Sequence, residues 1–592
     1  METAKLLATP PEGALSSTSQ RSAKLPWPTS APPLYSATDT NETDDTTAVA
    51  MDEEIVGNVY PPTMALLGTE PAPGKDCFTI AEGLNALGIG PFHYRLVFII
   101  GLISVATGLG STGFSLFPPL ARCHLHLDSL DEALLTSSGF AGAACGGMGI
   151  GYLATHFGRR TAIIMMILWI SYFGFLSGIT PGYRWLLGLR FVVGFGHGGA
   201  GQRVSILFEN LPTRYRTLGA GVLTLFFNIG NFLEAVFIKV LIPTGRKVAW
   251  RYILFTDASL FAVCILFSCW ITESPYFLLN IRGDRKKAYA VLKNISDLNH
   301  RPLPAGELVS EDEQRLGMIE SQYVLYNAPA PDVLDKSARA AEVDSENAAS
   351  PIEGLSSSNG SPKLSPSSPA CSGSFMDFFR PRVMLKTTVL MSISWISLSV
   401  AMVGATILTE EVLQERESTG GKCVGHFSVY HHHHQCDELS ATQYTPVIVI
   451  FASEFPSLLI TYYTANILGR RIALFLAFVF SGVFFALLLI CPVSLGLTTF
   501  FLAGCRMMVT TAWSLMIVYT AEVYPTYIRG LAVGFSRTQY RIGSILVPFL
   551  SQVLLRKSVY ASKSLHAGIC IATGVMLLFL PIETKNRDLG EG

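Results

Sequence analysis

Apolar residues dominate twelve stretches of this chain, each close to the length at which a helix crosses the hydrocarbon of a bilayer. Such a helix needs about 20 mostly apolar residues. Because no water satisfies the backbone inside a bilayer, each stretch is predicted to be an α-helix. The first six lie at roughly 96–120, 132–154, 161–180, 184–207, 217–241 and 251–272. The second six lie at roughly 383–408, 442–465, 472–491, 496–520, 531–554 and 560–581.

A polar motif in the first six stretches returns in the second six. Glu-x-x-Pro-Thr-x-x-Arg occurs at 209–216 and again at 522–529, and a glycine follows each copy at the same offset. The tripeptide Gly-Arg-Arg recurs at 158–160 and 469–471, and Glu273 matches Glu583. Such recurrence indicates a duplicated multi-helix unit. We therefore predict an all-α membrane protein whose twelve transmembrane helices form two six-helix bundles with pseudo-two-fold symmetry.

Composition excludes most other classes of protein. Among 592 residues, 49% are hydrophobic and 15% charged, and the mean hydropathy is +0.39. A soluble enzyme of this length would be less apolar, so the lipid bilayer is the expected partner. The net charge of -1 gives no reason to expect nucleic acid. Two G-x-G-x-x-G sequences lie within apolar helices rather than after strands, so no dinucleotide or other cofactor is expected.

The polar segments divide the chain into five parts. Residues 1–76 are rich in Pro, Ser and Thr and are expected to be a disordered cytosolic tail. Residues 77–280 and 381–583 hold the two bundles, and 584–592 form a second tail. The intervening linker, 281–380, is expected to begin with one or two surface helices and to continue as a flexible Ser, Pro and Ala segment. Residues 77–90 read as a short amphipathic segment before the first span.

Basic residues favour cytosolic termini only when those beside the linker are counted with the short loops. Cys423 and Cys436 then share the loop between spans 7 and 8 on the opposite face, where an oxidising environment would permit a disulfide. Cys123 is a competing partner. In the same loop, His431–His434 could bind a metal or sense pH, but four adjacent histidines cannot all face one ion. We favour a solvated patch and expect no metal site.

Eight charged residues within the predicted spans are candidates to line a central cavity. An ionised side chain at the bilayer centre costs about 2.5–3.5 kcal/mol on insertion scales, so each is expected to face the bundle interior. Arg537 and Arg541 are four residues apart and share a helix face, where two guanidinium groups could bind a carboxylate, sulfate or phosphate. The alternative for Arg537 is that it reaches the membrane interface. The remaining members are Glu234, Asp257, Glu454, Arg190, Arg203 and Arg506.

These residues supply candidates for proton coupling. Arg190 and His197 lie on one helical stripe, and a packing role for His197 is favoured over proton carriage although its pKa suits a switch. Glu234, Asp257 and Glu454 could each carry a proton if desolvated, or could simply neutralise a buried arginine. The coupling candidates are therefore Glu234, Glu454, Asp257 and His197.

The repeated motifs predict two charged clusters at one end of the bundles, which we call the clasps. Each is expected to pair internally and to act as a cytosolic gate that holds the outward-facing state. The first clasp comprises Arg159, Arg160, Glu209, Arg216 and Glu273. The second clasp comprises Arg470, Arg471, Glu522, Arg529 and Glu583.

By Glu273-Ser-Pro, the Gly-Arg-Arg turns, the repeated Glu-x-x-Pro-Thr-x-x-Arg and the terminal Pro-Ile-Glu-Thr-Lys, the chain resembles the major facilitator superfamily. Ser453-Glu-Phe-Pro456 and the segment 77–96 resemble the synaptic vesicle two-related group within it. The resemblance implies two bundles around a central cavity that opens alternately to either side, with organic cation and anion transporters as relatives. In anion carriers among these relatives, the position matching Arg541 is commonly arginine.

Several departures from that pattern fall at positions that matter for transport. Relatives usually place an Asp and a Glu in the first span, where this chain has Thr107 and Gly110. An acid normally precedes each Gly-Arg-Arg, where this chain has Thr155 and Asn466. The loss of the first two disfavours a cation substrate, and all four losses favour a protein that no longer transports.

We therefore predict a secondary transporter of a small organic ion, an anion being favoured, that works by alternating access and is not an enzyme. The alternative is a transport-deficient vesicle protein that serves as a receptor, scaffold or regulator. The expected molecule is a monomer in the plasma membrane or an intracellular vesicle. The predicted substrate contacts are Arg541, Arg537, Arg190, Gln202 and Trp395.

Overall fold

The computed structural model describes residues 77–241, 249–311, 313–314, 382–418, 444–490, 494–524, 526–554 and 558–584. The predicted disulfide between Cys423 and Cys436 and the run His431–His434 lie outside these residues. So do the tail 1–76, the tail from 585 and the linker from 315 to 381.

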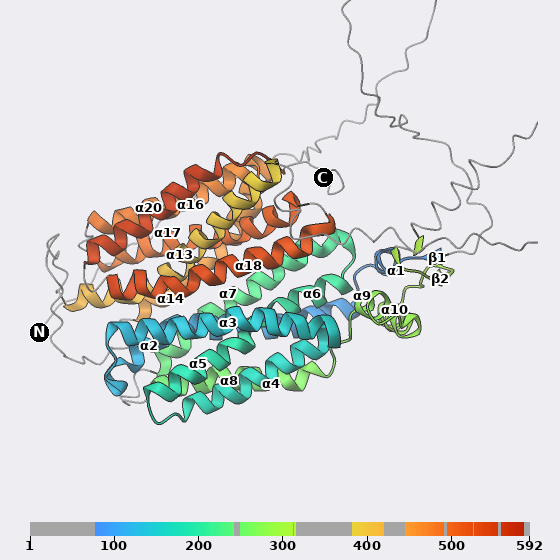
Figure 1. The fold of residues 1–592 in the computed structure, drawn as a ribbon, viewed down its shortest axis with the longest axis horizontal. Coiled ribbons are helices and arrows are strands. Elements are labelled where there is room, and N and C mark those ends of the chain that lie inside the picture. The colour runs from blue at the N-terminus through green and yellow to red at the C-terminus, as the bar shows by residue number, and fades with distance from the viewer. Residues whose placement is uncertain are drawn as a thin grey trace, which may run out of the picture. The chain divides into compact units, whose positions relative to one another are not determined.

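The first half is a bundle of helices that run roughly along one axis (Figure 1). Its spans correspond in order to α2, α3, α4, α5 with α6, α7 and α8. Their bounds are α2 (Pro91–Leu125), α3 (Ser129–Phe157), α4 (Arg159–Gly178), α5 (Tyr183–Gly198), α6 (Gly201–Asn210), α7 (Arg216–Leu241) and α8 (Ala249–Ser268), with a 3-10 turn η1 (Thr213–Tyr215) before α7.

The second half repeats this order, as the duplicated motifs predict. Its spans correspond to α13, α14 with α15, α16, α17, α18 and α20. Their bounds are α13 (Arg382–Ser418), α14 (Tyr444–Ala452), α15 (Glu454–Leu468), α16 (Arg470–Leu487), α17 (Leu495–Val523), α18 (Thr526–Pro548) and α20 (Val559–Leu577). A 3-10 turn η5 (Leu488–Ile490) follows α16, and a π-helical turn η6 (Phe549–Val553) extends α18.

The two-bundle, twelve-span fold predicted from the sequence is confirmed. Within the described residues, nine stretches are long and apolar enough to cross a membrane by length and composition. The other three predicted spans are also helical, as α5 with α6, α18 with η6, and α20. Figure 1 shows α13 to α20 gathered on one side and α2 to α6 with α8 on the other.

Two predicted spans are interrupted near their middle. Between α5 and α6, Gly199 N donates to Gly196 O at 3.0 Å and Ala200 N to His197 O at 3.2 Å, which tightens the turn to a 3-10 pattern. Between α14 and α15, the break falls at Ser453. Pro456 has no N–H to donate to the carbonyl of Ala452 one turn earlier, which loosens the helix there.

Glycines let α3 and α5 approach until their backbones touch. A Cβ on Gly146 would lie 1.8 Å from Phe195 O, and one on Gly194 would lie 2.1 Å from Gly139 O. Small residues at helix interfaces are typical of membrane bundles, where packing replaces the hydrophobic effect as the main attraction. This contact fixes α5, and with it Arg190 and His197, against α3.

The halves meet along α3 with α18, α7 with α14 and α15, and α2 with α13. Ser137 of α3 donates from Oγ to the carbonyl of Ile545 on α18 at 2.8 Å. Four of the charges predicted to face the bundle interior, Glu234, Glu454, Arg537 and Arg541, lie on these helices.

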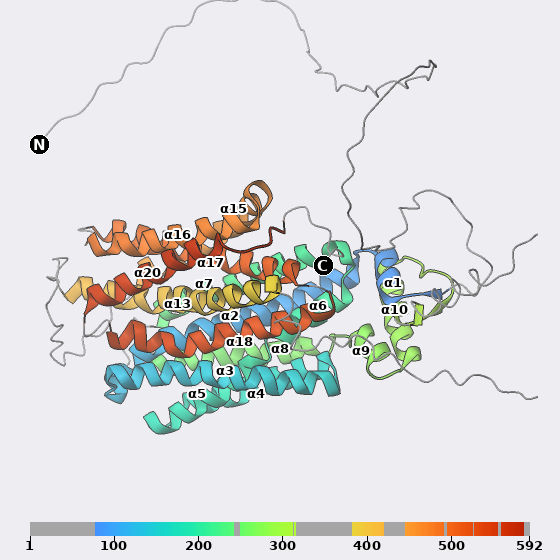
Figure 2. The ribbon, with the colours of Figure 1, turned by 45° about the horizontal axis from the view of Figure 1, so that its top comes forward.

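A small folded module joins the first half at one end of the bundle (Figure 2). It contains the parallel strands β1 (Cys77–Phe78) and β2 (Glu307–Leu308), and the helices α1 (Ile80–Leu87), α9 (Pro275–Asn280) and α10 (Arg285–Asn299). The predicted amphipathic segment and surface helix match α1 and α10, while the strand pair departs from the all-helical prediction. Asn299 Oδ1 accepts from Phe92 N at 3.2 Å, which caps the first turn of α2.

Candidate functional site

The first clasp forms around the turn between α3 and α4. Gly158 has φ 102°, a region that favours glycine, and a Cβ there would lie 2.2 Å from Glu273 Oε2. Glu273 Oε1 accepts from the backbone N–H groups of Arg159 at 2.9 Å and Arg160 at 3.1 Å. The carboxylate thus caps the positive N-terminal end of α4. Arg159 Nε pairs with Glu209 Oε1 at 3.2 Å.

The second clasp repeats this geometry. Gly469 has φ 85°, and Glu583 accepts from the backbone N–H of Arg470 at 2.9 Å and of Arg471 at 3.1 Å. Arg470 Nη2 pairs with Glu522 Oε1 at 3.0 Å. The sequence offset of about 310 residues therefore corresponds to two copies of one helix cap.

The described residues bring most, but not all, of the clasp members together. Arg216 donates from Nη2 to the hydroxyl of Tyr276 at 3.5 Å rather than to a clasp carboxylate. Burial raises the pKa of Tyr276, so this hydroxyl stays protonated at neutral pH. The side chain of Arg529 lies outside the described part of the structure. Thr155 lies close to the first clasp in the sequence. Its Oγ1 donates to Tyr152 O of the same helix at 2.7 Å.

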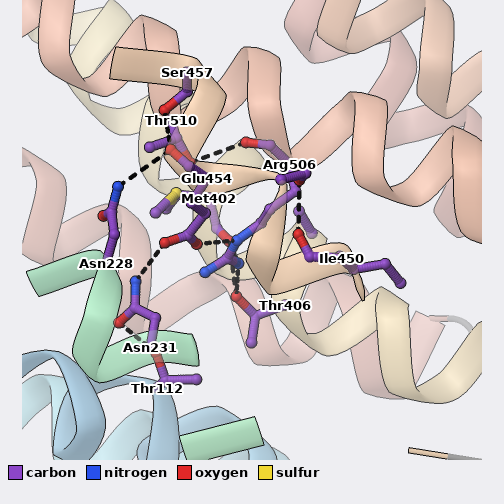
Figure 3. A network of polar contacts seen from close by, with 12 residues as sticks. Thr112, Asn228, Asn231, Met402, Thr406, Ile450, Glu454, Ser457, Arg506 and Thr510 are labelled. Carbon is purple, nitrogen blue, oxygen red and sulfur yellow. Dashed lines mark hydrogen bonds and ion pairs between the residues drawn. The ribbon is translucent and has the colours of Figure 1, made fainter. Parts of the chain in front are cut away.

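A buried ion pair lies in the middle of the second half (Figure 3). Arg506 Nε on α17 lies 2.6 Å from Glu454 Oε1 on α15, with side chains 3% and 0% exposed. Arg506 also donates to Thr406 Oγ1 and to Met402 O on α13, and its Cζ lies 4.5 Å from the Phe451 ring. Its Nε and Nη1 atoms therefore both have hydrogen-bond acceptors.

The same network reaches into the first half through two asparagines of α7 (Figure 3). Asn231 Nδ2 donates to Glu454 Oε2 at 2.9 Å, and Thr112 Oγ1 donates to Asn231 Oδ1 at 2.8 Å. Asn228, with its amide oriented to satisfy its neighbours, donates to Glu454 Oε2 at 3.3 Å. Both carboxylate oxygens of Glu454 thus accept hydrogen bonds.

A second buried charge centre lies in the first half and is not saturated. Glu234 of α7 and Asp257 of α8 approach each other at Gly113, where a Cβ would lie 3.1 Å from Glu234 Oε1 and 2.9 Å from Asp257 Oδ2. Both carboxylates are within electrostatic range of Arg190. Glu234 is fully buried, yet neither of its oxygens has a hydrogen-bond partner among the described residues, and Asp257 Oδ1 also has none.

Arg190 of α5 is held mainly by aromatic faces. Its Cζ lies 4.5 Å from the Phe114 ring and 4.2 Å from the Phe117 ring, and its Nε and Nη2 have no hydrogen-bond partner in the described structure. His197 packs edge-on against Phe114 and Phe261. A Cβ on Gly110 would lie 2.7 Å from His197 Cε1. The space beside Gly110 is therefore filled by this imidazole.

Arg541 and Arg537 lie on α18 and face the first half. Arg541 donates from Nη1 to Ala143 O on α3 and from Nη2 to Gly198 O at the end of α5, the latter at 3.3 Å. The Cζ of Arg537 lies 5.9 Å from the Trp513 ring. Arg541 thus contacts the first half, whereas the aromatic contact of Arg537 is with a ring of its own half.

The other two predicted substrate contacts lie in different surroundings. Trp395 is 2% exposed and donates from Nε1 to Thr520 Oγ1 at 3.2 Å, with Trp513 stacked edge-on 5.7 Å away. Gln202 is half-buried at the start of α6, next to Arg203 in the chain. Trp395 thus contributes an aromatic ring from the second half, and Gln202 a polar group from the first.

Three features of the site were not assigned from the sequence: the Glu454–Arg506 pairing, the asparagines that complete it, and a role for Arg203. One signal was available. Gly-x-Arg-x-x-Val occurs at 188–193 and at 504–509, so Arg190 and Arg506 are equivalent in the repeat. The interval to Glu209 is three residues longer than that to Glu522, and the break between α5 and α6 falls inside it.

Two six-helix halves with matching caps, mutually facing charges and a shared interface define a membrane transporter of the two-bundle class. A family model described as Sugar (and other) transporter matches residues 100–323 and 436–591. The chain belongs to this family, within the major facilitator superfamily. It is a multi-pass membrane protein whose relatives are transporters of small molecules.

Curated relatives match nearly the whole chain. Synaptic vesicle 2-related protein of Xenopus laevis is 29% identical over 529 residues, covering 88% of this chain and 83% of the relative. The putative transporter SVOPL of Homo sapiens is 27% identical, covering 86% and 93%. Organic cation/carnitine transporter 7 of Arabidopsis thaliana is 28% identical, covering 88% and 97%.

Solved structures match the fold. The xylose transporter XylE from E. coli, in a partially occluded inward-open conformation, superposes with a TM-score of 0.57 at 13% identity. The match covers 84% of this chain and 100% of XylE. At this identity the similarity concerns the architecture.

Proposed function

We propose that this chain is a secondary transporter that moves a small organic anion by alternating access, with Arg541 and Arg537 contacting the substrate. The observation that carries the proposal is a set of buried arginines at the interface of the halves that form no ion pair within the described residues. A cation brought to them would be repelled, whereas an anion would neutralise them.

Proton coupling is assigned to Glu234 and Asp257 acting together. Two carboxyl groups that approach each other in a buried site cannot both ionise without mutual repulsion, so one proton is readily shared between them. Arg190 favours ionisation of the pair, and its own charge is left uncompensated when both acids are protonated. The pair can therefore exist in two charge states, which is what a coupled carrier needs.

Glu454 is not assigned to coupling. Arg506 and two amide groups saturate its oxygens, so protonating Glu454 would break several hydrogen bonds at once. We assign it to holding α15 against α17 and α7. His197 is assigned a packing role, because it is wedged between two phenylalanines and Gly110.

The clasps are assigned to the cytosolic face, with both termini cytosolic. Each clasp pairs within its own half, so its role in gating would be to fix the ends of α4 and α16 rather than to tie one half to the other. The name of the synaptic vesicle 2-related relatives supports residence in a vesicle membrane, with the plasma membrane as the alternative. We assign the chain no enzymatic activity and treat it as a monomer.

A second candidate function is a transporter-shaped receptor or scaffold. It is favoured by Thr107 and Gly110, neither of which offers a carboxylate in the first span. Thr107 Oγ1 donates to its own helix at Ile103 O, and Gly110 gives its space to His197. Arg190 and Glu234 argue against the scaffold function. Their buried polar atoms lack hydrogen-bond partners among the described residues, which lowers stability, and a scaffold has no use for such atoms.

Uptake of labelled organic anions into proteoliposomes tests the proposal. Arg541→Ala should lower uptake by roughly ten- to a hundredfold, the loss expected for hydrogen bonds to a charged group. Arg184→Ala is the matched control, because Arg184 is an exposed arginine at the start of α5. Equal uptake by both variants and the unaltered protein would refute the substrate role of Arg541. No uptake of any anion would favour the scaffold.

A further inference from the structure

A third arginine lies near the proposed substrate contacts and comes from the opposite half. Arg203 is on α6, between the α5–α6 break and Glu209 of the first clasp. Its Nε and Nη1 are buried without hydrogen-bond partners in the described structure, and its Cζ lies 5.5 Å from the Phe227 ring. Two guanidinium nitrogens of this half-buried side chain are therefore without a protein acceptor within the described part of the chain.

Arg203, Arg537 and Arg541 influence one another electrostatically. Arg203 lies within range of charge repulsion from Arg537, and Arg537 within range of Arg541. None of the three forms an ion pair with a carboxylate among the described residues. The carbonyl groups of Ala143 and Gly198 solvate Arg541 but carry no charge that would cancel it. Buried cations this close together require negative charge for stability.

Flat aromatic surfaces flank the α18 arginines. Trp513 stacks edge-on against Tyr540 with ring centroids 4.8 Å apart, and Tyr540 stands between Arg537 and Arg541 in the sequence. Trp395 extends the same cluster toward α13. Rings beside guanidinium groups suit a ligand with both a planar apolar body and acidic groups, because the body stacks while the acids pair.

The number and positions of these three arginines limit the class of ligand further. A ligand with one negative charge would neutralise one arginine and leave the other two in mutual repulsion. A ligand with two acidic groups could pair through one of them with Arg537 or Arg541 on α18 and through the other with Arg203 on α6. Such a ligand would also connect the two halves, so its binding would favour conformations in which they are close.

On the basis of the proposed anion transport, we infer that the preferred substrate is a planar aromatic dianion, such as a dicarboxylate, bound between Arg203 of the first half and Arg537 with Arg541 of the second. Arg203 sets the preference for two charges. The Trp513–Tyr540 surface sets the preference for an aromatic body.

Three probes separate these features in the purified full-length protein: benzoate, phthalate and cis-cyclohexane-1,2-dicarboxylate. Affinity is measured by ligand-dependent thermal shift, and transport by competition with labelled phthalate in proteoliposomes. Phthalate should bind about tenfold more tightly than benzoate, equivalent to about 1.4 kcal/mol, because it adds one charge pair. It should bind roughly threefold more tightly than the cyclohexane compound, because only phthalate stacks.

Variants then assign the preference to residues. Arg203→Gln should reduce the phthalate preference over benzoate to about twofold while benzoate affinity changes less than about threefold. Arg203→Lys, which keeps the charge, should retain most of the preference. Arg184→Gln is the control and should change neither affinity.

The outcomes distinguish this inference from the proposal on which it rests. Equal binding of benzoate and phthalate by the unaltered protein overturns the dianion inference and leaves anion transport standing. A phthalate preference that survives Arg203→Gln overturns the role of Arg203. Absence of any response to all three probes overturns the dianion inference, and together with absent uptake of other anions it overturns anion transport as well.

Discussion

Arg190 and Arg506 occupy equivalent positions in the duplicated sequence, yet their surroundings differ in how completely the charges are paired. Arg506 meets Glu454 directly, and two asparagines complete the acceptor needs of that carboxylate. Arg190 lies between two phenylalanine rings, and the acids near it keep unpartnered oxygens. Arg506 is held in an ion pair that joins two helices. Arg190 keeps nitrogen atoms without hydrogen-bond partners among the described residues.

The difference also separates the halves by task. Glu454 belongs to the second half but accepts from Asn231 of the first, so the saturated centre joins the halves. The unsaturated centre draws Arg190, Glu234 and Asp257 entirely from the first half. Under the proposed function, the saturated centre would serve as the fixed contact between the halves and the unsaturated centre as the group that changes charge.

The largest expected effect comes from breaking the saturated centre. Arg506→Leu leaves Glu454 buried without its cation and should lower the free energy of unfolding by about 3–5 kcal/mol. The measurement is thermal unfolding in detergent. Arg285→Leu, which removes an exposed ion pair with Glu307 and Glu313, should cost no more than about 1 kcal/mol.

The double variant Glu454→Leu with Arg506→Leu sharpens this result. Replacing both charges with apolar groups removes the stranded carboxylate, so much of the stability lost in Arg506→Leu should return. If the double variant were as unstable as Arg506→Leu, the stability loss would come from losing the ion pair itself rather than from burying an unpaired acid.

Changes in the unsaturated centre of Glu234, Asp257 and Arg190 should affect stability less, but should clearly reduce the coupling of transport to protons. Glu234→Gln with Asp257→Asn preserves size and removes the exchangeable proton. Uptake driven by a pH gradient should fall at least about tenfold. Thermal stability should fall less than in Arg506→Leu, because Arg190 keeps its contacts with the Phe114 and Phe117 rings when both acids become neutral. Uptake is compared with and without the gradient. A large loss of stability with coupling intact would make this centre a structural tie like the other.

The smallest effect should come from Gly113→Ala, which places a methyl group where the two carboxyl groups approach. The new Cβ would lie 2.9 Å from Asp257 Oδ2 and 3.1 Å from Glu234 Oε1, so one side chain must shift. Gradient-driven uptake should fall roughly threefold, equivalent to about 0.7 kcal/mol. Gly151→Ala, also on a helix but with open space around it, serves as the control. Unchanged uptake in Gly113→Ala would argue that the two acids act separately.

The fold was accessible from the sequence because lipid imposes strong local rules. The helices, the Gly-Arg-Arg turns and the repeated Glu-x-x-Pro-Thr-x-x-Arg can each be predicted from a short stretch of sequence. The helix caps made by Glu273 and Glu583 follow from such motifs once their spacing is known. The breaks at Gly199 and Ser453 were not predicted as interruptions, because they depend on packing against other helices.

The pairing of buried charges was much less accessible. Sequence identifies Glu454 and Arg506 as expensive residues in the membrane, but their separation of 52 residues says nothing about contact. Asn231, which decides whether Glu454 is saturated, carries no charge and gave no signal. The parallel strands β1 and β2 were missed because each has only two residues, too few for an alternating pattern.

Those short strands have a further consequence for the segments that flank the first half. Cys77 pairs with Glu307 and Phe78 with Leu308, and Gln314 Nε2 reaches Glu82 Oε1 at 3.4 Å. The chain therefore enters the first half and leaves it through neighbouring strands, which lie about 5 Å apart in a sheet. Cys77 and Gln314, the described residues on either side of the first half, therefore belong to one small folded module. A partner with one binding module for each segment would encounter the second at high effective concentration once it had bound the first.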